Sequence, residues 1–343
     1  MFEILSILFI VLGLSVLVII HEAGHFFASK WFGLWVEEFG FGLPPRLWGK
    51  KIGETLYSFN WLPFGGFVKI YGENRTEQSE QEPARSFNRQ PLGRRAAVIG
   101  AGVVMNFLLG WVLLSAVFMT GIPRALLVTE VKAGGIADLA GIKKGDQLTD
   151  FKSVSELIES IDENKGQEVS LNVKRGKEQV IIIVMPRLAV PEGEGNLGIY
   201  LTELGLPQSG ILESFWRGLV NAASLTKMIF FGIADLIVGV FTDISILERF
   251  MGPVGIINVA VETTKLGAAH FLQLLALISL NLAVFNVFPI PALDGGRLFL
   301  LLVEKIKGSP LNPKIEMAVN GLGFAFLLFL ILTITVKDIL ALL

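Results

Sequence analysis

Four long apolar runs constrain this chain of 343 residues more than any other feature. A helix needs about 20 apolar residues to cross a bilayer, and backbone inside lipid must form helices or closed barrels. Only 17% of the residues are charged, against about 25% in soluble domains. The four runs are residues 4–27, 96–121, 268–288 and 317–336. The sequence therefore predicts a polytopic α-helical membrane protein with four transmembrane helices.

A fifth apolar stretch, residues 211–241, has a different pattern. Its polar residues fall within about a quarter turn on a helical wheel at 100° per residue. They are Glu213, Arg217, Asn221, Ser224, Asp235 and Thr242. Such a stripe favours an amphipathic helix at the membrane interface over a transmembrane helix. A spanning helix here would place everything downstream on the opposite side of the membrane.

Basic residues predict the orientation of the chain. Lys and Arg are concentrated in residues 30–95 and 297–314, between the first and second and between the third and fourth runs. Such enrichment marks the cytoplasmic side. The two termini and the segment after the second run are then expected to be extracytoplasmic.

Residues 122–190 have the pattern of a small soluble α+β domain. Short β-like runs are separated by glycine turns, and "SVSELIESIDENKG" predicts a helix with a serine cap. A hairpin is expected around Arg175 and Gly176.

The first apolar run ends in His21-Glu22-Ala23-Gly24-His25. Ionisable residues are costly in lipid and usually mark function. Histidines four residues apart share one helix face and can hold a single divalent metal. Glu22, turned by about 100°, can act as general acid/base on a metal-bound water. A buried polar network is the alternative interpretation.

The third metal ligand has more than one candidate. The chain has no cysteine, which excludes thiolate ligands. Glu37 and Glu38 follow the histidines in a loop-like segment. Asp294 lies far downstream in "NVFPIPALDGGRLF", where prolines interrupt the helix and glycines allow a tight turn. If residues 211–241 do not span, Asp294 reaches the same depth as the histidines.

HExxH in the first run, together with Asn-x-x-Pro-x-Pro-x-Leu-Asp-Gly-Gly at residues 286–296, resembles the site-2 protease family of intramembrane zinc metalloproteases. The likeness is greatest to bacterial regulator-of-sigma-E-type proteases. It implies His21, His25 and Asp294 as zinc ligands and Glu22 as the catalytic acid/base. It also implies cleavage of single-span substrates, such as anti-sigma-factor-like regulators or signal-peptide remnants, in the bacterial cytoplasmic membrane. The metal site is then expected near the cytoplasmic side.

Other segments resemble substrate-binding parts of the same family. "LPFGGFVKIYGE", residues 62–73, matches a re-entrant β-hairpin loop whose edge would pair with substrate backbone. The alternative is a simple surface hairpin. Two asparagines in "SLNLAVFNVFP" match family residues expected to bind unwound substrate. The candidate substrate-binding residues are Gly65, Gly66, Phe67, Asn281 and Asn286.

The soluble segment also carries a resemblance, because "VTEVKAGGIADLAGIKKGDQLTDF" is similar to a PDZ domain. Such domains bind extended peptides at a sheet edge. A steric filter that binds no peptide is the alternative. The predicted partners are single-span substrates, membrane lipid and a peptide that the PDZ-like domain could bind. The net charge of −2 gives no sign of a nucleic-acid partner.

The predicted division of the chain follows these features. Residues 1–121 hold the first two transmembrane helices and the hairpin loop, and 122–190 the PDZ-like domain. Residues 191–266 are a linker and amphipathic helices, and 267–343 the last two transmembrane helices. Two other functions stay open: a non-catalytic membrane scaffold, which has no use for Glu22, and a metal transporter, which needs ligands in further helices.

Overall fold

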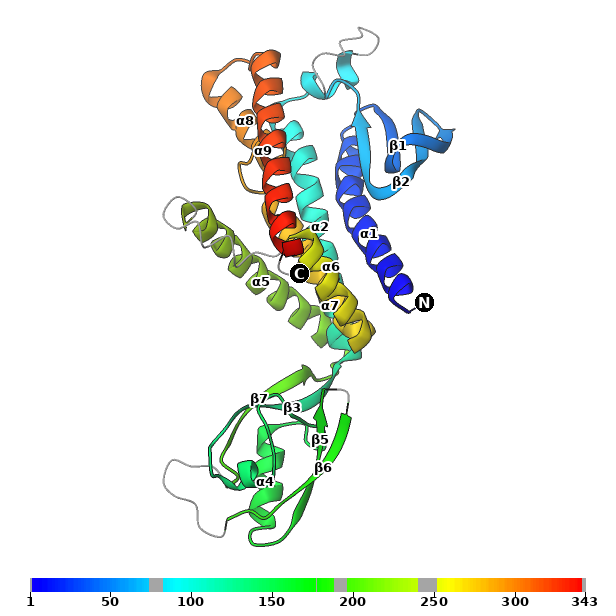
Figure 1. Cartoon of the computed structure of the whole chain (residues 1–343). Helices are drawn as coiled ribbons and strands as arrows, with labels where there is room; N and C mark the ends of the chain where they lie inside the picture. Colours follow the sequence, from blue (N-terminus) through cyan, green and yellow to red (C-terminus); the bar gives the residue numbers. More distant parts are fainter. Residues whose placement is uncertain (1, 74–82, 177, 188–195, 240–251, 341–343) are drawn as a thin grey trace. The chain divides into compact units, whose positions relative to one another are not determined.

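The computed structural model describes residues 2–73, 83–176, 178–187, 196–239 and 252–340. The chain divides into two compact units (Figure 1). One, the helical unit, contains Met1–Val117 and Leu212–Leu343. The other, the sheet unit, contains Phe118–Ile211.

Long helices dominate the helical unit. They are α1 (Phe2–Trp31), α2 (Leu92–Thr120), α5 (Ile211–Gly239), α6 (Pro253–Leu266), α7 (Ala268–Phe285), α8 (Asp294–Lys307) and α9 (Pro313–Leu340), with short 3-10 turns at Pro83–Arg85 and Phe87–Arg89. Each of the four predicted apolar runs lies in a helix: α1, α2, α7 and α9. Helix α7 ends at Phe285, shortly before Pro289, because proline lacks the amide hydrogen that would continue a helix.

Five of the described helices are long and apolar enough to cross a membrane. Besides the four expected ones, they include α5 over Ile211–Leu236. Length and apolar content therefore admit α5 as a fifth span, and the predicted count of four stays a prediction.

Helix α5 runs in the same direction as α7. In its first half, Ala222 packs with Ala276 and Leu280 of α7. Near its end, Ile233 packs against Val284 and Phe288, at the end of α7 and just beyond it. Two successive parallel helices require the chain to return between them, and α6, which packs on α7, is the described part of that return. Asp294, which follows α7, therefore lies at the end of the helical unit where α5 and α7 both end. This holds whether or not α5 crosses the membrane.

A long antiparallel hairpin packs on α1. It consists of β1 (Val36–Ile52) and β2 (Thr55–Ile70), which turn at Gly53 with φ of +62°. Strand β2 bends, so that residues 56–59 pair with residues 38–41 of β1 and residues 66–70 pair with residues 36–41, on the opposite side. Residues 66–70 therefore form an edge with which no other described strand pairs. The predicted hairpin at residues 62–73 is not a hairpin of its own. Its residues 62–70 form the second half of strand β2.

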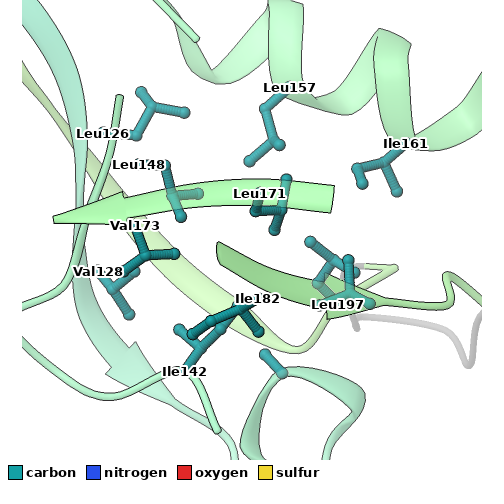
Figure 2. Packing of buried hydrophobic residues seen from close by; sticks show 12 residues of the cluster. Leu126, Val128, Ile142, Leu148, Leu157, Ile161, Leu171, Val173, Ile182 and Leu197 are labelled. Carbon is teal, nitrogen blue, oxygen red and sulfur yellow. The ribbon is translucent and has the colours of Figure 1, made fainter. Parts of the chain in front are cut away.

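The sheet unit is a five-stranded antiparallel sheet in the order β6-β5-β4-β3-β7. Its elements are β3 (Ile122–Val131), α3 (Ile136–Leu139), β4 (Gln147–Leu148), α4 (Val154–Glu163), β5 (Val169–Arg175), β6 (Glu178–Val184) and β7 (Ile199–Leu206). Leu157 and Ile161 of α4 pack into a core with buried residues of the sheet such as Leu126, Leu148 and Leu171 (Figure 2). The unit thus has a hydrophobic core of its own.

Two local predictions for the sheet unit are confirmed. The hairpin around Arg175 and Gly176 joins β5 to β6. Ser153 caps α4, because its Oγ accepts from the Glu156 N–H at 3.2 Å. The sheet extends past the predicted boundary at residue 190, because β7 pairs with β3. The remainder of the predicted linker region contains α5 and α6, and its residues 191–195 and 240–251 lie outside the described residues.

Candidate active site

Three side chains meet where α1 approaches the start of α8. Helix α1 carries His21 and His25 one turn apart, and Asp294 is the first residue of α8. Asp294 Oδ2 lies 3.1 Å from His21 Nε2 and 3.3 Å from His25 Nε2, and the two Nε2 atoms are 3.2 Å apart. Ligands of a tetrahedral zinc at 2.0–2.2 Å are separated by about 3.3 Å. The triangle therefore has the size of one face of a zinc tetrahedron.

The chemistry of the three groups also fits a cation. Asp294 Oδ2 is buried and, within the described residues, accepts no hydrogen bond. A buried carboxylate oxygen is costly without a compensating partner. In the described part of the chain, no other group of three or more such ligands lies close enough to share an ion. Glu37 pairs with Lys69 and Glu38 with Arg46, so the geometry favours Asp294 over both alternatives.

Hydrogen bonds orient the two imidazoles. His25 Nδ1 lies 2.8 Å from Val98 O, and since a carbonyl can only accept, Nδ1 carries the proton and Nε2 is left for a metal. His21 Nδ1 lies 3.2 Å from the Asn106 amide. Asn106 Oδ1 is buried without a hydrogen bond in the described structure, and turning the amide end for end lets it accept the Nδ1–H. Ser279 of α7 donates to Asn106 O at 2.8 Å and ties α7 to this arrangement.

Two glycines allow α1 and α2 to lie close together. A Cβ on Gly24 would overlap with the Ala101 carbonyl. A Cβ on Gly102 would lie 2.5 Å from His25 Nε2 and 2.7 Å from His21 Cε1. Gly102 is a site residue that sequence reasoning missed. The signal was present as small residues within the second apolar run, which mark close helix contacts without naming the partner.

A tightly folded loop before α8 positions Asp294 in the LDGG segment. A Cβ on Gly295 or Gly296 would overlap with carbonyl groups of residues 287–290. The loop therefore folds back over the first turn of α8, and only glycine leaves room for it. The predicted break in the helix is present, but the two glycines lie in the first turn of α8 and the positive φ falls on Ala292. The glycines allow this close approach and do not form the tight turn that was expected.

Glu22 lies between the three candidate ligands and the edge of the hairpin. Its Oε2 accepts the Val68 N–H at 3.1 Å, and a Cβ on Gly66 would lie 3.8 Å from its Cγ. Both residues belong to the edge segment 66–70. Glu22 also interacts electrostatically with the two histidines and Asp294. A candidate base, three candidate metal ligands and a strand edge that no other described strand pairs with therefore share one site.

A family model matches the part of the chain that contains this site. The model of peptidase family M50 covers residues 9–330, which include α1, both strands of the hairpin, the sheet unit and the LDGG loop. The chain belongs to peptidase family M50. The resemblance to site-2 proteases is thereby confirmed.

Named M50-type relatives are similar along their whole length. A Clostridium perfringens protein, provisionally named a zinc metalloprotease, is 35% identical over 97% of this chain and 98% of its own. The Bacillus subtilis "Regulator of sigma-W protease RasP" is 28% identical over 94% and 95%. The Oceanobacillus iheyensis "Zinc metalloprotease RasP" is 29% identical over 96% and 97%. The similarity covers both units of this M50 chain.

The predicted substrate-binding residues of this M50 protein fall in two places. Gly65, Gly66 and Phe67 lie at or next to the edge segment beside Glu22, and Gly65 has φ of +76°. Asn281 instead donates its Nδ2–H to Leu277 O of its own helix at 2.9 Å, and Asn286 caps the end of α7. No hydrogen bond among the described residues joins either asparagine to the three ligands.

Proposed function

We propose that this chain, a zinc metalloprotease of family M50, hydrolyses peptide bonds within transmembrane segments of single-span substrates. The observation that carries the proposal is the triangle of His21, His25 and Asp294 beside Glu22, on helices long enough to cross a membrane. Zinc bound by these residues would act as a Lewis acid and lower the pKa of water to about 7.

Glu22 is the proposed general acid/base. Its carboxylate takes the proton of the attacking water as the new C–O bond forms, and gives it to the amide nitrogen as the C–N bond breaks. The second proton of the water stays on the new carboxyl group, so the products are a carboxylic acid and an amine, which ionise to carboxylate and ammonium at neutral pH, and Glu22 is regenerated. Because Val68 N–H holds Oε2, the other carboxylate oxygen is left to exchange the proton.

The strand edge at residues 66–70 is the proposed substrate platform. A substrate that adds as a strand there is held extended by main-chain hydrogen bonds. Extension exposes the peptide carbonyl, which a helix shields. Gly65, Gly66 and Phe67 would contact the substrate at this edge. Asn281 and Asn286 would bind backbone groups that unwinding releases, because an amide can both donate and accept.

The proposed setting is a bacterial cytoplasmic membrane with the metal site near the cytoplasmic face. The chain is a multi-pass membrane protein, and the basic segments around the site support this orientation. The termini and the sheet unit would then be extracytoplasmic. A relative named as a regulator of a sigma factor supports anti-sigma-factor-like substrates. The sheet unit would act as a PDZ-like domain that binds a peptide or excludes large substrates.

The test pairs two variants with a single-span reporter substrate. Glu22→Gln should lower kcat by about 10² to 10⁴-fold and retain zinc, while Asp294→Ala should lose zinc. Glu37→Gln, a carboxylate outside the triangle, is the control and should leave the zinc content unchanged. Cleavage by Glu22→Gln at the wild-type rate would overturn the mechanism, whereas no cleavage of the reporter by the wild-type protein would return it to the scaffold class. Normal zinc content in Asp294→Ala would overturn the ligand set.

A further inference from the structure

An ion pair joins the strand that holds Glu22 to the helix that carries Asp294. Arg297 Nη2 lies 2.5 Å from Glu73 Oε1. Glu73 follows β2, where its N–H donates to Ile70 O at 3.1 Å. Arg297 lies in the first turn of α8, one turn after Asp294.

Arg297 is the cation among three carboxylates. It interacts electrostatically with Glu73, Asp294 and Glu316, which come from the end of the hairpin, the start of α8 and the start of α9. The Arg297 and Glu73 side chains are only 30% and 18% exposed, so solvent screens this pair less than it screens a surface ion pair. Loss of Arg297 would remove the positive charge that interacts with these three acidic groups.

The pair stands in the wall of a cavity of about 640 Å³ beside the site. Val68, whose N–H holds Glu22, and Ala292, in the loop before Asp294, line the same cavity. Ala292 has φ of +74°, and its N–H donates to Asn320 Oδ1 at 3.3 Å. The pair thus lies between Val68, which holds Glu22, and the loop that precedes Asp294.

We propose that the Glu73–Arg297 pair is a positioning contact that sets the separation of Glu22 from Asp294. The inference rests on the proposed roles of those two residues. Strand β2 holds Glu22 through Val68, and five residues later it reaches Arg297 through Glu73. If the contact is lost, the LDGG loop can move relative to the base, and a misplacement of about 1 Å can cost about 10²-fold in rate.

The experiment compares Glu73→Gln, Arg297→Gln and the double variant in full-length enzyme with the reporter substrate. Each single variant should lower kcat by about 10 to 100-fold and release zinc more readily to a chelator, with KM within about 2-fold. The kcat of the double variant should be no lower than that of the less active single variant, because the two residues act as one unit. Losses that multiply, or wild-type kcat and zinc retention in both single variants, would overturn the proposal.

A matched ion pair controls for a merely structural effect. Arg95 of α2 and Glu304 of α8 are 2.8 Å apart and more deeply buried, but Glu304 lies near the other end of α8. Arg95→Gln should lower the unfolding temperature and leave the kcat of folded enzyme within about 2-fold. An equal loss of kcat in Arg95→Gln would refute a specific role for Glu73–Arg297. Failure of the proposed function shows separately, as no cleavage of the reporter by the wild-type enzyme, and failure of the proposed role of Glu22 shows as wild-type cleavage by Glu22→Gln.

Discussion

Replacing Gly102 with alanine is the most direct test of how α2 shapes the site. The new Cβ would lie 2.5 Å from His25 Nε2 and 2.7 Å from His21 Cε1, whereas ordinary contacts begin near 3.4 Å. The rings must therefore move by about 0.9 Å. The two helices are closely packed at this level, since a Cβ on Gly24 of α1 would overlap with the Ala101 carbonyl of α2.

The magnitude follows from the size of this displacement. A shift of about 1 Å in a reacting group can cost about 10²-fold, and the substitution moves two metal-binding groups at once. We expect Gly102→Ala to lower zinc affinity and kcat by at least about 10²-fold. The amount of folded protein in the membrane should be close to that of the wild type.

The assay measures zinc per folded molecule and cleavage of the reporter substrate. Gly100→Ala is the control, because it makes the same change two residues earlier in α2 and its Cβ meets nothing within 4 Å. It should keep full zinc content and gain up to about 1 kcal/mol of helix stability. Wild-type zinc content and kcat in Gly102→Ala would refute the packing of α2 against the histidines.

The sheet unit carries two further predictions, both measured by urea unfolding of that unit in the full-length protein through limited proteolysis. Burial alone raises the pKa of Asp146, but hydrogen bonds from Arg175 at 2.7 and 2.8 Å and from the Lys143 N–H outweigh burial and lower the pKa. The stability from Asp146 is therefore complete above its unfolded pKa of about 4 and is lost as the pH falls toward the lower folded value. Asp146→Asn should cost about 1–3 kcal/mol at pH 7 and remove this acid sensitivity; an unaltered pH profile would contradict the role of Asp146. Leu171→Ala, at a fully buried position, should lower the free energy of unfolding by about 2–5 kcal/mol. Leu139→Ala, at a residue 81% exposed, is the control and should change it by no more than about 0.5 kcal/mol. Equal effects of the two substitutions would contradict the assignment of the core.

The sequence was most informative where a single helix or loop decides the geometry. The spacing of His21 and His25 predicted one shared helix face, and the LDGG segment predicted an irregular loop around Asp294. Both appear in the structure because they depend on local backbone periodicity and on Gly/Pro chemistry. The ion pairs of Glu37 and Glu38 could not be predicted, because they depend on partners brought by the fold.

Features that depend on two elements meeting were largely missed. The role of Gly102 requires knowing that α2 faces α1 at this position. The extent of the hairpin was underestimated, because the residues before position 62 pair twice with one strand. The amphipathic stripe of α5 is present in the sequence, but periodicity alone does not say whether the stripe faces lipid headgroups or a neighbouring helix. The return of the chain through α6 likewise depends on tertiary packing.

The ligand triangle also has a consequence for assembly. His25 and Asp294 are separated by about 270 residues, and the sheet unit, with its own core, lies between them in the chain. An ion held by both closes a loop around a complete folding unit, and a cation at about 1,000 times its Kd adds about 4 kcal/mol to the assembled state. The metal would therefore act as a crosslink between two chain segments as well as a reagent. If the chain is cut inside the sheet unit, His21 and His25 lie on one fragment and Asp294 on the other. The two fragments should then dissociate more readily when zinc is removed.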